Sequence, residues 1–369
     1  MLLIQTNRDT LLKILQSVTG VVERRHTLPI LSNVLLEGKE NGFSFTATDL
    51  EIQVEASSGE IVFENDFAIT ISAKKLQDIL RALAEGIKIT LDEKDGKILV
   101  KAGKSKFNLQ SLPAEDFPKF PSTEGNEQKL EIAQKVFRKL LNEVQFAMAQ
   151  QDIRYYLNGM LIVLKDGKIR VVATDGHRLS YAEAELSSSL DIDAEVIIPR
   201  KTVIELLRLL AESDDNLQIS IGKNQIKFSF DKVTLNSKIV EGKFPDYTKV
   251  IPASYNNMFT VDRVTMLQAL QRAAILSNEK FRGVRMVLTK DNVSVISSNS
   301  EQEEAQEDVE IKYSGAAIDI GFNVSYLLDV LNNVNSQEIE CSFGDSNSSG
   351  VFTLPGNSTF KYVVMPMRI

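Results

Sequence analysis

Internal repetition is the feature that most restricts how this 369-residue chain can fold. Three segments each show the periodicity of an amphipathic helix, then a polar break, then an apolar run typical of a strand. These segments are residues 8–36, 134–164 and 262–288. A second helix pattern, followed by a β-hairpin pattern with Gly, Asp or Asn in its turn, also recurs in each copy. The second helix patterns lie at residues 71–86, 198–213 and 321–336.

Element order and spacing that recur three times are hard to obtain by chance. We therefore predict an α+β fold made of three tandem copies of a domain with two helices laid on antiparallel sheet. Pro, Gly, Ser and Asn accumulate near residues 120–128 and 251–257, where we expect the boundaries. The predicted domains are residues 1–125, 126–253 and 254–369.

The composition excludes several classes of protein. No apolar run approaches the roughly 18 residues of a membrane span, and no secretory signal precedes the first repeat, so we expect a cytoplasmic protein without a membrane partner. With one cysteine (Cys341) and two histidines (His26 and His177), the chain offers no disulfide and no Cys/His cluster for zinc. We expect neither a metal nor another cofactor.

Residues 172–180 (VATDGHRLS) hold an acid, a glycine and a histidine together. The first repeat carries TATDLE at the equivalent place, so Asp175, like Asp49, is predicted to turn the backbone after a strand. No GxSxG, phosphate-loop or HExxH motif is present, which argues against an enzyme. The alternative is a hydrolase that uses Asp175 and His177.

His177 has no counterpart in the other repeats, so it is a candidate for a function performed once per chain. In the same repeat, Arg154, Tyr155, Tyr156 and Leu157 follow the first helix pattern, and we predict them at the end of that helix. Tyrosine and arginine are enriched at binding hot spots. The alternative is a pair of tyrosines half-buried in a helix–strand corner.

Several long motifs together carry a family resemblance: TDGHRL, QQDIRYYLNGM, RAAILSNEKFRGVR, FPDY, GFNVSYLLDVL and YVVMPMRI. They resemble the bacterial DNA polymerase III beta subunit, the replicative sliding clamp, and the resemblance extends through all three repeats. It implies the DNA clamp fold, a head-to-tail homodimer that forms a ring around double-stranded DNA without reading its sequence. Such a processivity factor is not catalytic.

The resemblance also implies partners that bind a cleft through short linear motifs: the replicative DNA polymerase, the clamp loader, other polymerases, and mismatch-repair or ligase-type factors. The alternative is a triplicated protein-binding scaffold that does not encircle DNA.

The resemblance assigns three sets of residues. The partner-peptide cleft comprises Arg154, Leu157, Thr174, Gly176, His177, Arg178, Leu179, Pro245, Lys249, Val250, Asn323, Tyr326, Ser349, Val363, Met365, Pro366, Met367 and Arg368. The DNA-binding set comprises Arg25, Lys74, Gln151, Tyr155, Tyr156, Arg200 and Lys201. The dimer interface comprises Lys75, Lys106, Phe107, Leu109, Ile275, Leu276, Glu301, Glu303 and Glu304.

Charge is distributed unevenly along the chain. The net charge is −8, yet lysine and arginine concentrate on the predicted helices and acidic residues on the predicted strands, a pattern that favours phosphate beside the helices. The helix pattern at 321–336 departs from this, because it carries Asp329 and no Lys or Arg. For the acidic run EQEEAQEDVE at 301–310, the alternative to an interface is a solvated loop.

Overall fold

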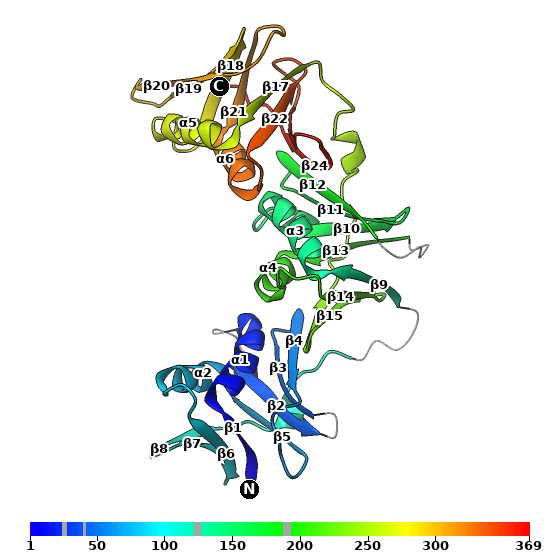
Figure 1. The fold of residues 1–369 in the computed structure, drawn as a ribbon, viewed down its shortest axis with the longest axis vertical. Coiled ribbons are helices and arrows are strands. Elements are labelled where there is room, and N and C mark those ends of the chain that lie inside the picture. Colours follow the sequence, from blue (N-terminus) through cyan, green and yellow to red (C-terminus); the bar gives the residue numbers. More distant parts are fainter. Residues whose placement is uncertain (24–27, 40–41, 122–126, 187–192) are drawn as a thin grey trace. The chain divides into compact units, whose positions relative to one another are not determined.

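The computed structural model describes residues 1–23, 28–39, 42–121, 127–186 and 193–369 (Figure 1). Within these ranges one order of elements occurs three times: a strand, a helix, four strands, a second helix and three strands. The predicted triplication and α+β class are confirmed. The strand that opens each repeat was not predicted, because only its pairing with a strand far along the chain distinguishes it from a polar lead-in to the helix.

The bounds of the elements follow the same pattern in each repeat. The first contains β1 (Leu2–Asn7), α1 (Arg8–Val18), β2 (Asn33–Lys39), β3 (Gly42–Thr48), β4 (Ile52–Ser58), β5 (Phe67–Ser72), α2 (Ala73–Ala82), β6 (Lys88–Lys94), β7 (Lys97–Ala102) and β8 (Ser105–Gln110). The second contains β9 (Gln128–Ala133), α3 (Gln134–Val144), β10 (Gly159–Lys165), β11 (Lys168–Thr174), β12 (Arg178–Glu185), β13 (Ala194–Pro199), α4 (Arg200–Leu209), β14 (Asn216–Ile221), β15 (Gln225–Phe230) and β16 (Val233–Lys238). The third contains β17 (Asn257–Asp262), α5 (Arg263–Ile275), β18 (Gly283–Thr289), β19 (Asn292–Ser298), β20 (Glu304–Glu310), β21 (Ile318–Asn323), α6 (Val324–Asn333), β22 (Glu338–Phe343), β23 (Gly350–Leu354) and β24 (Asn357–Val364).

The second helix of each repeat is shorter than its sequence pattern. α2, α4 and α6 have ten residues each, because the residues before them form strands β5, β13 and β21. Polar N-caps fix where two of them begin: the Ser72 hydroxyl accepts from Lys75 N–H, and the Asn323 side chain accepts from Ser325 N–H. A strand that runs directly into a capped helix leaves no loop residues between them.

All strand pairings are antiparallel, and the sheets do not stop at the repeat boundaries. One eight-stranded sheet has the order β5-β2-β3-β4-β16-β15-β14-β9, and another has the order β13-β10-β11-β12-β24-β23-β22-β17. In each of these sheets, the fourth strand of one repeat pairs with the last strand of the next repeat. These pairs are β4 with β16 and β12 with β24. Two four-stranded sheets, β1-β6-β7-β8 and β20-β19-β18-β21, complete the described fold.

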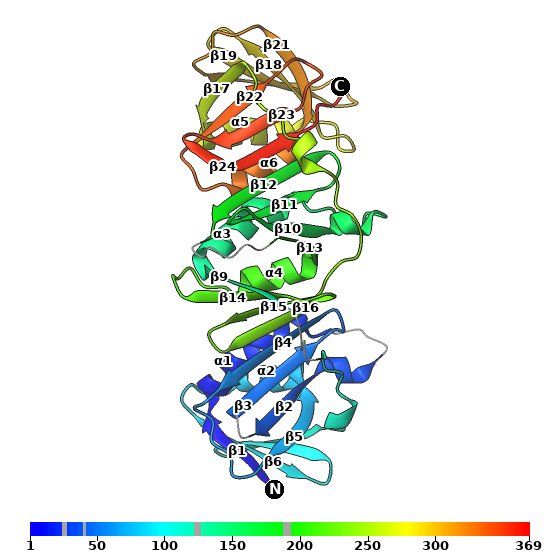
Figure 2. The ribbon, with the colours of Figure 1, turned by 90° about the vertical axis from the view of Figure 1, so that its right-hand side faces the viewer.

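This sharing of sheets explains how the chain divides into compact units. One unit contains Met1–Lys135 and Ile204–Ile239, and the other contains Val136–Val203 and Val240–Ile369. The division cuts the middle repeat, because its two sheets belong to ladders with different neighbours. In the second unit, Figure 2 shows β10, β11, β12 and β24 following one another in the sheet.

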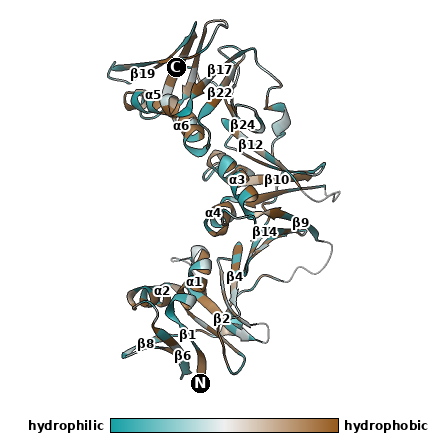
Figure 3. Ribbon diagram, in the orientation of Figure 1, coloured by the Kyte–Doolittle hydropathy of each residue, from teal (hydrophilic) through white to brown (hydrophobic). Residues whose placement is uncertain are grey.

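Each unit buries its apolar side chains between helices and sheet. In α1, Leu11, Leu15 and Val18 are fully buried, whereas the polar residues between them face outward. Figure 3 shows hydrophilic and hydrophobic residues on the same helices. Strand β10 is buried over all but its last residue, so both faces of the sheet are covered there.

None of the helices in the described ranges is long and apolar enough to cross a membrane. In the same ranges, no three His, Cys, Asp or Glu side chains are grouped as metal ligands would be.

Candidate functional site

The turn between β11 and β12 is built on Asp175. Its Oδ1 accepts the backbone N–H groups of His177 at 2.9 Å and Arg178 at 3.1 Å. Thr174 Oγ1 donates to the Arg178 carbonyl at 2.6 Å and accepts from Gly176 N–H, and Gly176 has φ +92°. A side-chain acceptor of this kind closes a tight turn. The predicted structural role of Asp175 is confirmed.

The equivalent turns of the other repeats have the same construction. Asp49 Oδ1 accepts from the N–H groups of Glu51 and Ile52, and Thr48 Oγ1 donates to the Ile52 carbonyl at 2.8 Å. In the third repeat, Asn299 Oδ1 accepts from Glu301 and Glu303. The side chains that the turns carry differ, because only the second repeat has a histidine and an arginine there, His177 and Arg178.

Arg178 is the centre of a buried polar network. Its guanidinium donates to Asp175 Oδ2 at 3.1 Å, to the Phe146 carbonyl at 2.7 Å and to the Asp329 carboxylate. The same group lies 4.5 Å from the centroid of the Tyr326 ring. Burial opposes the charge, but Tyr362, Asp329 and Asp175 outweigh it, so the pKa of Arg178 is raised. The network joins β12 to α6 and to the segment after α3.

Arg154 lies in a hydrogen-bonded loop beside this turn. Asp152 accepts from Arg154 Nε at 3.0 Å and Nη2 at 2.9 Å, and Arg154 Nη2 also donates to the Asp175 carbonyl at 3.3 Å. The hydrogen bonds from Arg154 lower the pKa of Asp152 to about 2. Asn158 exchanges two 2.9 Å hydrogen bonds with the Asp152 backbone, which closes the loop.

The expected position of this cluster at the end of the first helix is wrong. α3 ends at Val144, and Tyr155–Asn158 form a separate 3₁₀ turn after the loop. Leu157 is buried at 1% exposure, Tyr156 packs against the same apolar cluster, and Tyr155 is 58% exposed. The two tyrosines therefore have different environments, because only one of them faces the core.

Residues after β24 link the turn to the third repeat. Met365 N–H donates to the His177 carbonyl at 2.9 Å, and Met367 N–H donates to the Gly321 carbonyl at 2.8 Å. Ile369 packs where Gly283 and Gly321 lack side chains, and a Cβ on Gly321 would collide with the Met367 carbonyl. Met365 is 51% exposed, whereas Val363 is buried. This tail, residues 365–369, thus carries exposed apolar groups on a fixed backbone.

The segment between β16 and β17 supplies the other apolar groups. Phe244 lies in one buried cluster with Leu157, Leu179 and Val363, and Tyr247 and Ile251 pack on that cluster. Between these anchors, Pro245 is exposed, Val250 is 42% exposed, and Lys249 pairs with Asp246 at 3.1 Å. Anchored residues alternate with exposed ones, so the segment presents an apolar edge to solvent.

The remaining cleft residues are placed by neighbouring elements. Asn323 caps α6. Tyr326 lies in the first turn of α6, and its backbone carbonyl accepts a hydrogen bond from Tyr362 Oη at 3.0 Å. Ser349 precedes Gly350, which pairs with Val364. Pro366 is half-buried and Arg368 exposed. All the predicted cleft residues lie in the second compact unit.

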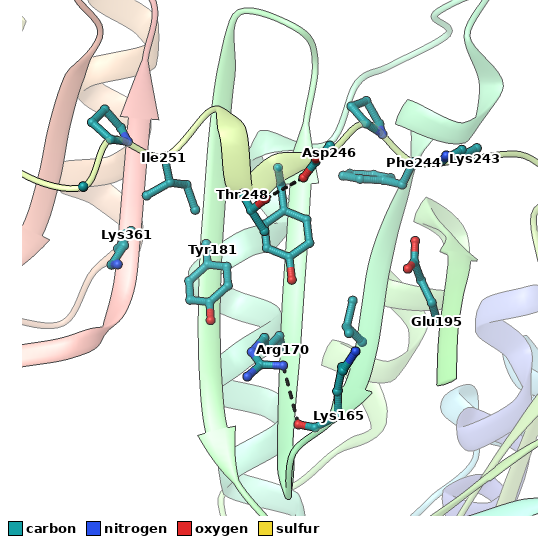
Figure 4. A pocket seen from close by; sticks show the side chains of 15 residues that line it. Lys165, Arg170, Tyr181, Glu195, Lys243, Phe244, Asp246, Thr248, Ile251 and Lys361 are labelled. Atoms are coloured by element: carbon teal, nitrogen blue, oxygen red, sulfur yellow. Dashed lines mark hydrogen bonds between the residues drawn. The ribbon is translucent and has the colours of Figure 1, made fainter. Parts of the chain in front are cut away.

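A pocket of about 710 Å³ lies between the same segment and the strands beneath it (Figure 4). Tyr181, Arg170 and Lys165 line it from the strands, and Asp246 and Ile251 line it from the segment above. Tyr181 Oη donates to Glu183 at 2.6 Å, and the Tyr181 and Tyr247 rings lie 5.9 Å apart. Burial and Glu183 raise the pKa of Tyr181. Pro245 borders this pocket and is also a predicted cleft residue.

The predicted DNA-binding residues that the structure describes are divided between the two compact units. Arg25 lies outside the described residues. Lys74 is exposed on α2 and pairs with Asp78. Gln151 has φ +57° in the Arg154 loop. At the start of α4, Arg200 donates to the Met148 carbonyl at 3.4 Å, and burial and the nearby Arg178 lower its pKa. Lys201 follows it in the same turn.

The predicted interface residues lie on two edge strands, at two helix ends and in one turn. Strand β8 contains Lys106, Phe107 and Leu109, and strand β20 contains Glu304. Both are edge strands of their sheets. Ile275 ends α5 with 76% of its surface exposed, and Leu276 caps that helix. Lys75 N–H donates to the Ser72 hydroxyl at the start of α2. Glu301 and Glu303 lie in the turn held by Asn299.

Sequence reasoning missed the residues that hold the site in place. Asp152, Phe146, Asp329 and Tyr362 each contact Arg154 or Arg178. The one available signal was the acid on an otherwise uncharged helix, Asp329, which now has a partner in Arg178. Since Arg178 and Asp329 are 151 residues apart, no local pattern could connect them.

Comparison with known proteins places the whole chain in one family. Models of the N-terminal, central and C-terminal domains of the DNA polymerase III beta subunit match residues 2–121, 131–246 and 248–368. The beta sliding clamp of Pseudomonas aeruginosa is 45% identical over 365 residues, 98% of each chain. The crystal structure of the P. aeruginosa beta subunit covers 100% of both chains at 44% identity with a TM-score of 0.96. A structure of a P. aeruginosa sliding clamp bound to griselimycin, also 44% identical over 100% of both chains, has a TM-score of 0.95. The chain belongs to the DNA polymerase III beta subunit family.

Proposed function

We propose that this protein is a DNA sliding clamp, a processivity factor that encircles duplex DNA and tethers the replicative polymerase and other replication and repair proteins. Its family membership and the names of its relatives support this function. The observation that carries it further is the strand pairing across the repeat boundaries, which leaves β8 and β20 as edge strands of the two four-stranded sheets.

The strand pairs at the repeat boundaries show which strand the last strand of each repeat pairs with. The last strand of the second repeat pairs with β4, and the last strand of the third repeat pairs with β12. By the same rule the last strand of the first repeat, β8, requires the strand equivalent to β4 and β12, which is β20. Unpaired edges invite association. A second copy, placed head to tail, would pair both edges and give a closed, two-fold assembly.

The repeats also predict the register of this pairing. At the two internal junctions, Val54 lies opposite Leu235 and Ser180 lies opposite Tyr362. The equivalent residues, aligned through the neighbouring strands of each hairpin, are Ala305 in β20 and Phe107 in β8. On the solvent face Lys106 then lies opposite Gln306, diagonal to Glu304 and Asp308, where opposite charges attract.

A cysteine pair tests this register. Lys106→Cys with Gln306→Cys should form an intermolecular disulfide in high yield, because directly opposed residues have Cα atoms within the span of a disulfide. Lys106→Cys with Glu310→Cys is the matched control, since Glu310 lies on the same face of β20, four residues away. Non-reducing electrophoresis distinguishes the two. Equal cross-linking of both pairs, or a native mass corresponding to a single chain, would contradict the dimer.

The contact with DNA is proposed to be weak and independent of sequence. Exposed Tyr155 and the start of α4 in the second compact unit, and exposed Lys74 in the first, support contacts with the DNA backbone that insert no element into a groove. Retention would then depend on topology. We expect the loaded protein to stay on nicked circular DNA and to run off the same molecule once it is linearised, as measured by gel filtration after clamp loading. Equal retention on both forms would overturn the encircling mechanism.

The partner site is proposed to be the apolar edge formed by Pro245, Val250 and Met365, with His177 and Arg154 beside it. The griselimycin complex of a related clamp supports a ligand-binding surface in this family. Methionine adapts to different apolar side chains, which suits several partner peptides. We propose that the site is not catalytic: both Asp175 oxygens are engaged, by two backbone amides and by Arg178. The proposed location is the cytoplasm.

A further inference from the structure

Each internal junction between repeats contains one arginine that joins an acid on a second helix to a backbone carbonyl in the last turn of a first helix or just after it. At the junction of the first and second repeats, Arg208 binds Glu205 in α4 and donates to the carbonyls of Gln16 at 3.0 Å and Ser17 at 2.7 Å. Those carbonyls belong to the last turn of α1, where a cation also interacts favourably with the helix dipole.

The junction of the second and third repeats achieves the same link with a different arginine. Arg178 in β12 binds Asp329 in α6 and donates to the Phe146 carbonyl, just after α3 ends. Because α2, α4 and α6 have ten residues each, starting at Ala73, Arg200 and Val324, the sixth residue is Asp78, Glu205 and Asp329 respectively. The acid therefore occupies the same position in all three repeats.

The arginine of a junction comes from one of two positions in the repeat. One is the ninth residue of the second helix, which is Arg208 in α4 and Asn332 in α6. The other is the strand residue that follows the turn, Ile52 in the first repeat and Arg178 in the second. Each internal junction has its arginine at one position and a neutral residue at the other.

At the edge left for a second copy, these positions hold Arg81 in α2 and Glu303 before β20. Arg81 is exposed, and among the described residues its guanidinium has no hydrogen bond or ion pair. Its acid, Asp78, pairs with Lys74 instead. We infer that Arg81 is the arginine of the junction between two copies: it binds Asp78 and caps the C-terminal turn of α5 in the partner copy.

The receiving surface is present at the end of α5. A hollow of about 480 Å³ is lined there by Ile275, Ser277, Glu279 and Glu301, among others. Ile275, the last residue of α5, is the thirteenth residue counted from the start of its helix, and Gly20 has the same place counted from the start of α1. Gly20 lies directly against the Glu205 carboxylate. Glu279 and Glu301 favour an incoming guanidinium, and Lys280, which also lines the hollow, offsets part of their charge.

This inference rests on the proposed head-to-tail dimer, and its test separates the two. We expect Arg81→Ala to raise the dissociation constant of the dimer about 100-fold, roughly tenfold at each of two junctions. Subunit exchange between donor-labelled and acceptor-labelled chains, followed without DNA, measures the effect. Arg285→Ala is the matched control, because it removes an exposed Arg–Asp pair from β18, away from both edges.

Two further variants keep the test specific. Asp78→Ala should weaken the dimer, and its effect should not add to that of Arg81→Ala, because the two residues act as one unit. Arg81→Lys should fall between wild type and alanine, since lysine keeps the charge without the planar fork of donors. Thermal unfolding checks that each variant folds. A wild-type monomer would overturn the proposed function, whereas a wild-type dimer with Arg81→Ala within about twofold of it would overturn this inference alone.

Discussion

A protein that ends at Val364 should lose partner binding while remaining a dimer. Deleting Met365–Ile369 removes the exposed Met365 side chain, the hydrogen bonds to His177 and Gly321, and the packing of Ile369 on Gly283. These groups form one side of the proposed partner site. We expect the affinity for the replicative polymerase to fall at least about 100-fold, as expected when apolar hot-spot contacts are removed together.

Surface plasmon resonance with the immobilised polymerase measures this loss, and sedimentation reports the dimer. Met258→Ala is a suitable control, because Met258 is similarly exposed at 47% but lies on β17, outside the proposed site. The proposed dimer edges, β8 and β20, are untouched by the deletion. If the shortened dimer still binds the polymerase as tightly as the full chain, the site is assigned to the wrong surface.

Replacing Arg178 with alanine should destabilise the second compact unit by about 3 kcal/mol, because it leaves acids and a carbonyl without their donor in a largely buried network. The Arg178 side chain is only 10% exposed, and it binds Asp175, Asp329 and the Phe146 carbonyl together. Partner binding should weaken as well, since the same residue fixes the turn that presents His177.

Urea unfolding followed by two probes measures this effect and tests whether the units unfold separately. Arg285→Ala again provides the comparison, because its pair with Asp319 is exposed and should contribute less than about 1 kcal/mol. Arg178→Lys should recover only part of the loss, since a single ammonium cannot reach all three partners. If Arg178→Ala were no more destabilising than Arg285→Ala, the network would not hold this unit together.

The sequence was sufficient for local features that repeat. The threefold order of elements, the six helices of the described chain and the turn built on Asp175 all followed from periodicity and from the comparison of TATDLE with VATDGH. These features depend on contacts between residues close in the chain, such as Asp49 with Ile52. The domain limits and the residues assigned by resemblance remain predictions.

The tertiary structure decided which surfaces meet, because pairing across the repeats depends on contacts that no local periodicity records. It extended two sheets through the repeat boundaries, moved Tyr155 from the end of α3 into a separate turn, and gave Asp329 a partner in Arg178. Asp329 illustrates the division best. In the sequence, an acid on this helix departed from the expectation that the helices carry basic residues. In the structure, its carboxylate pairs with the buried Arg178, and this ion pair connects two repeats.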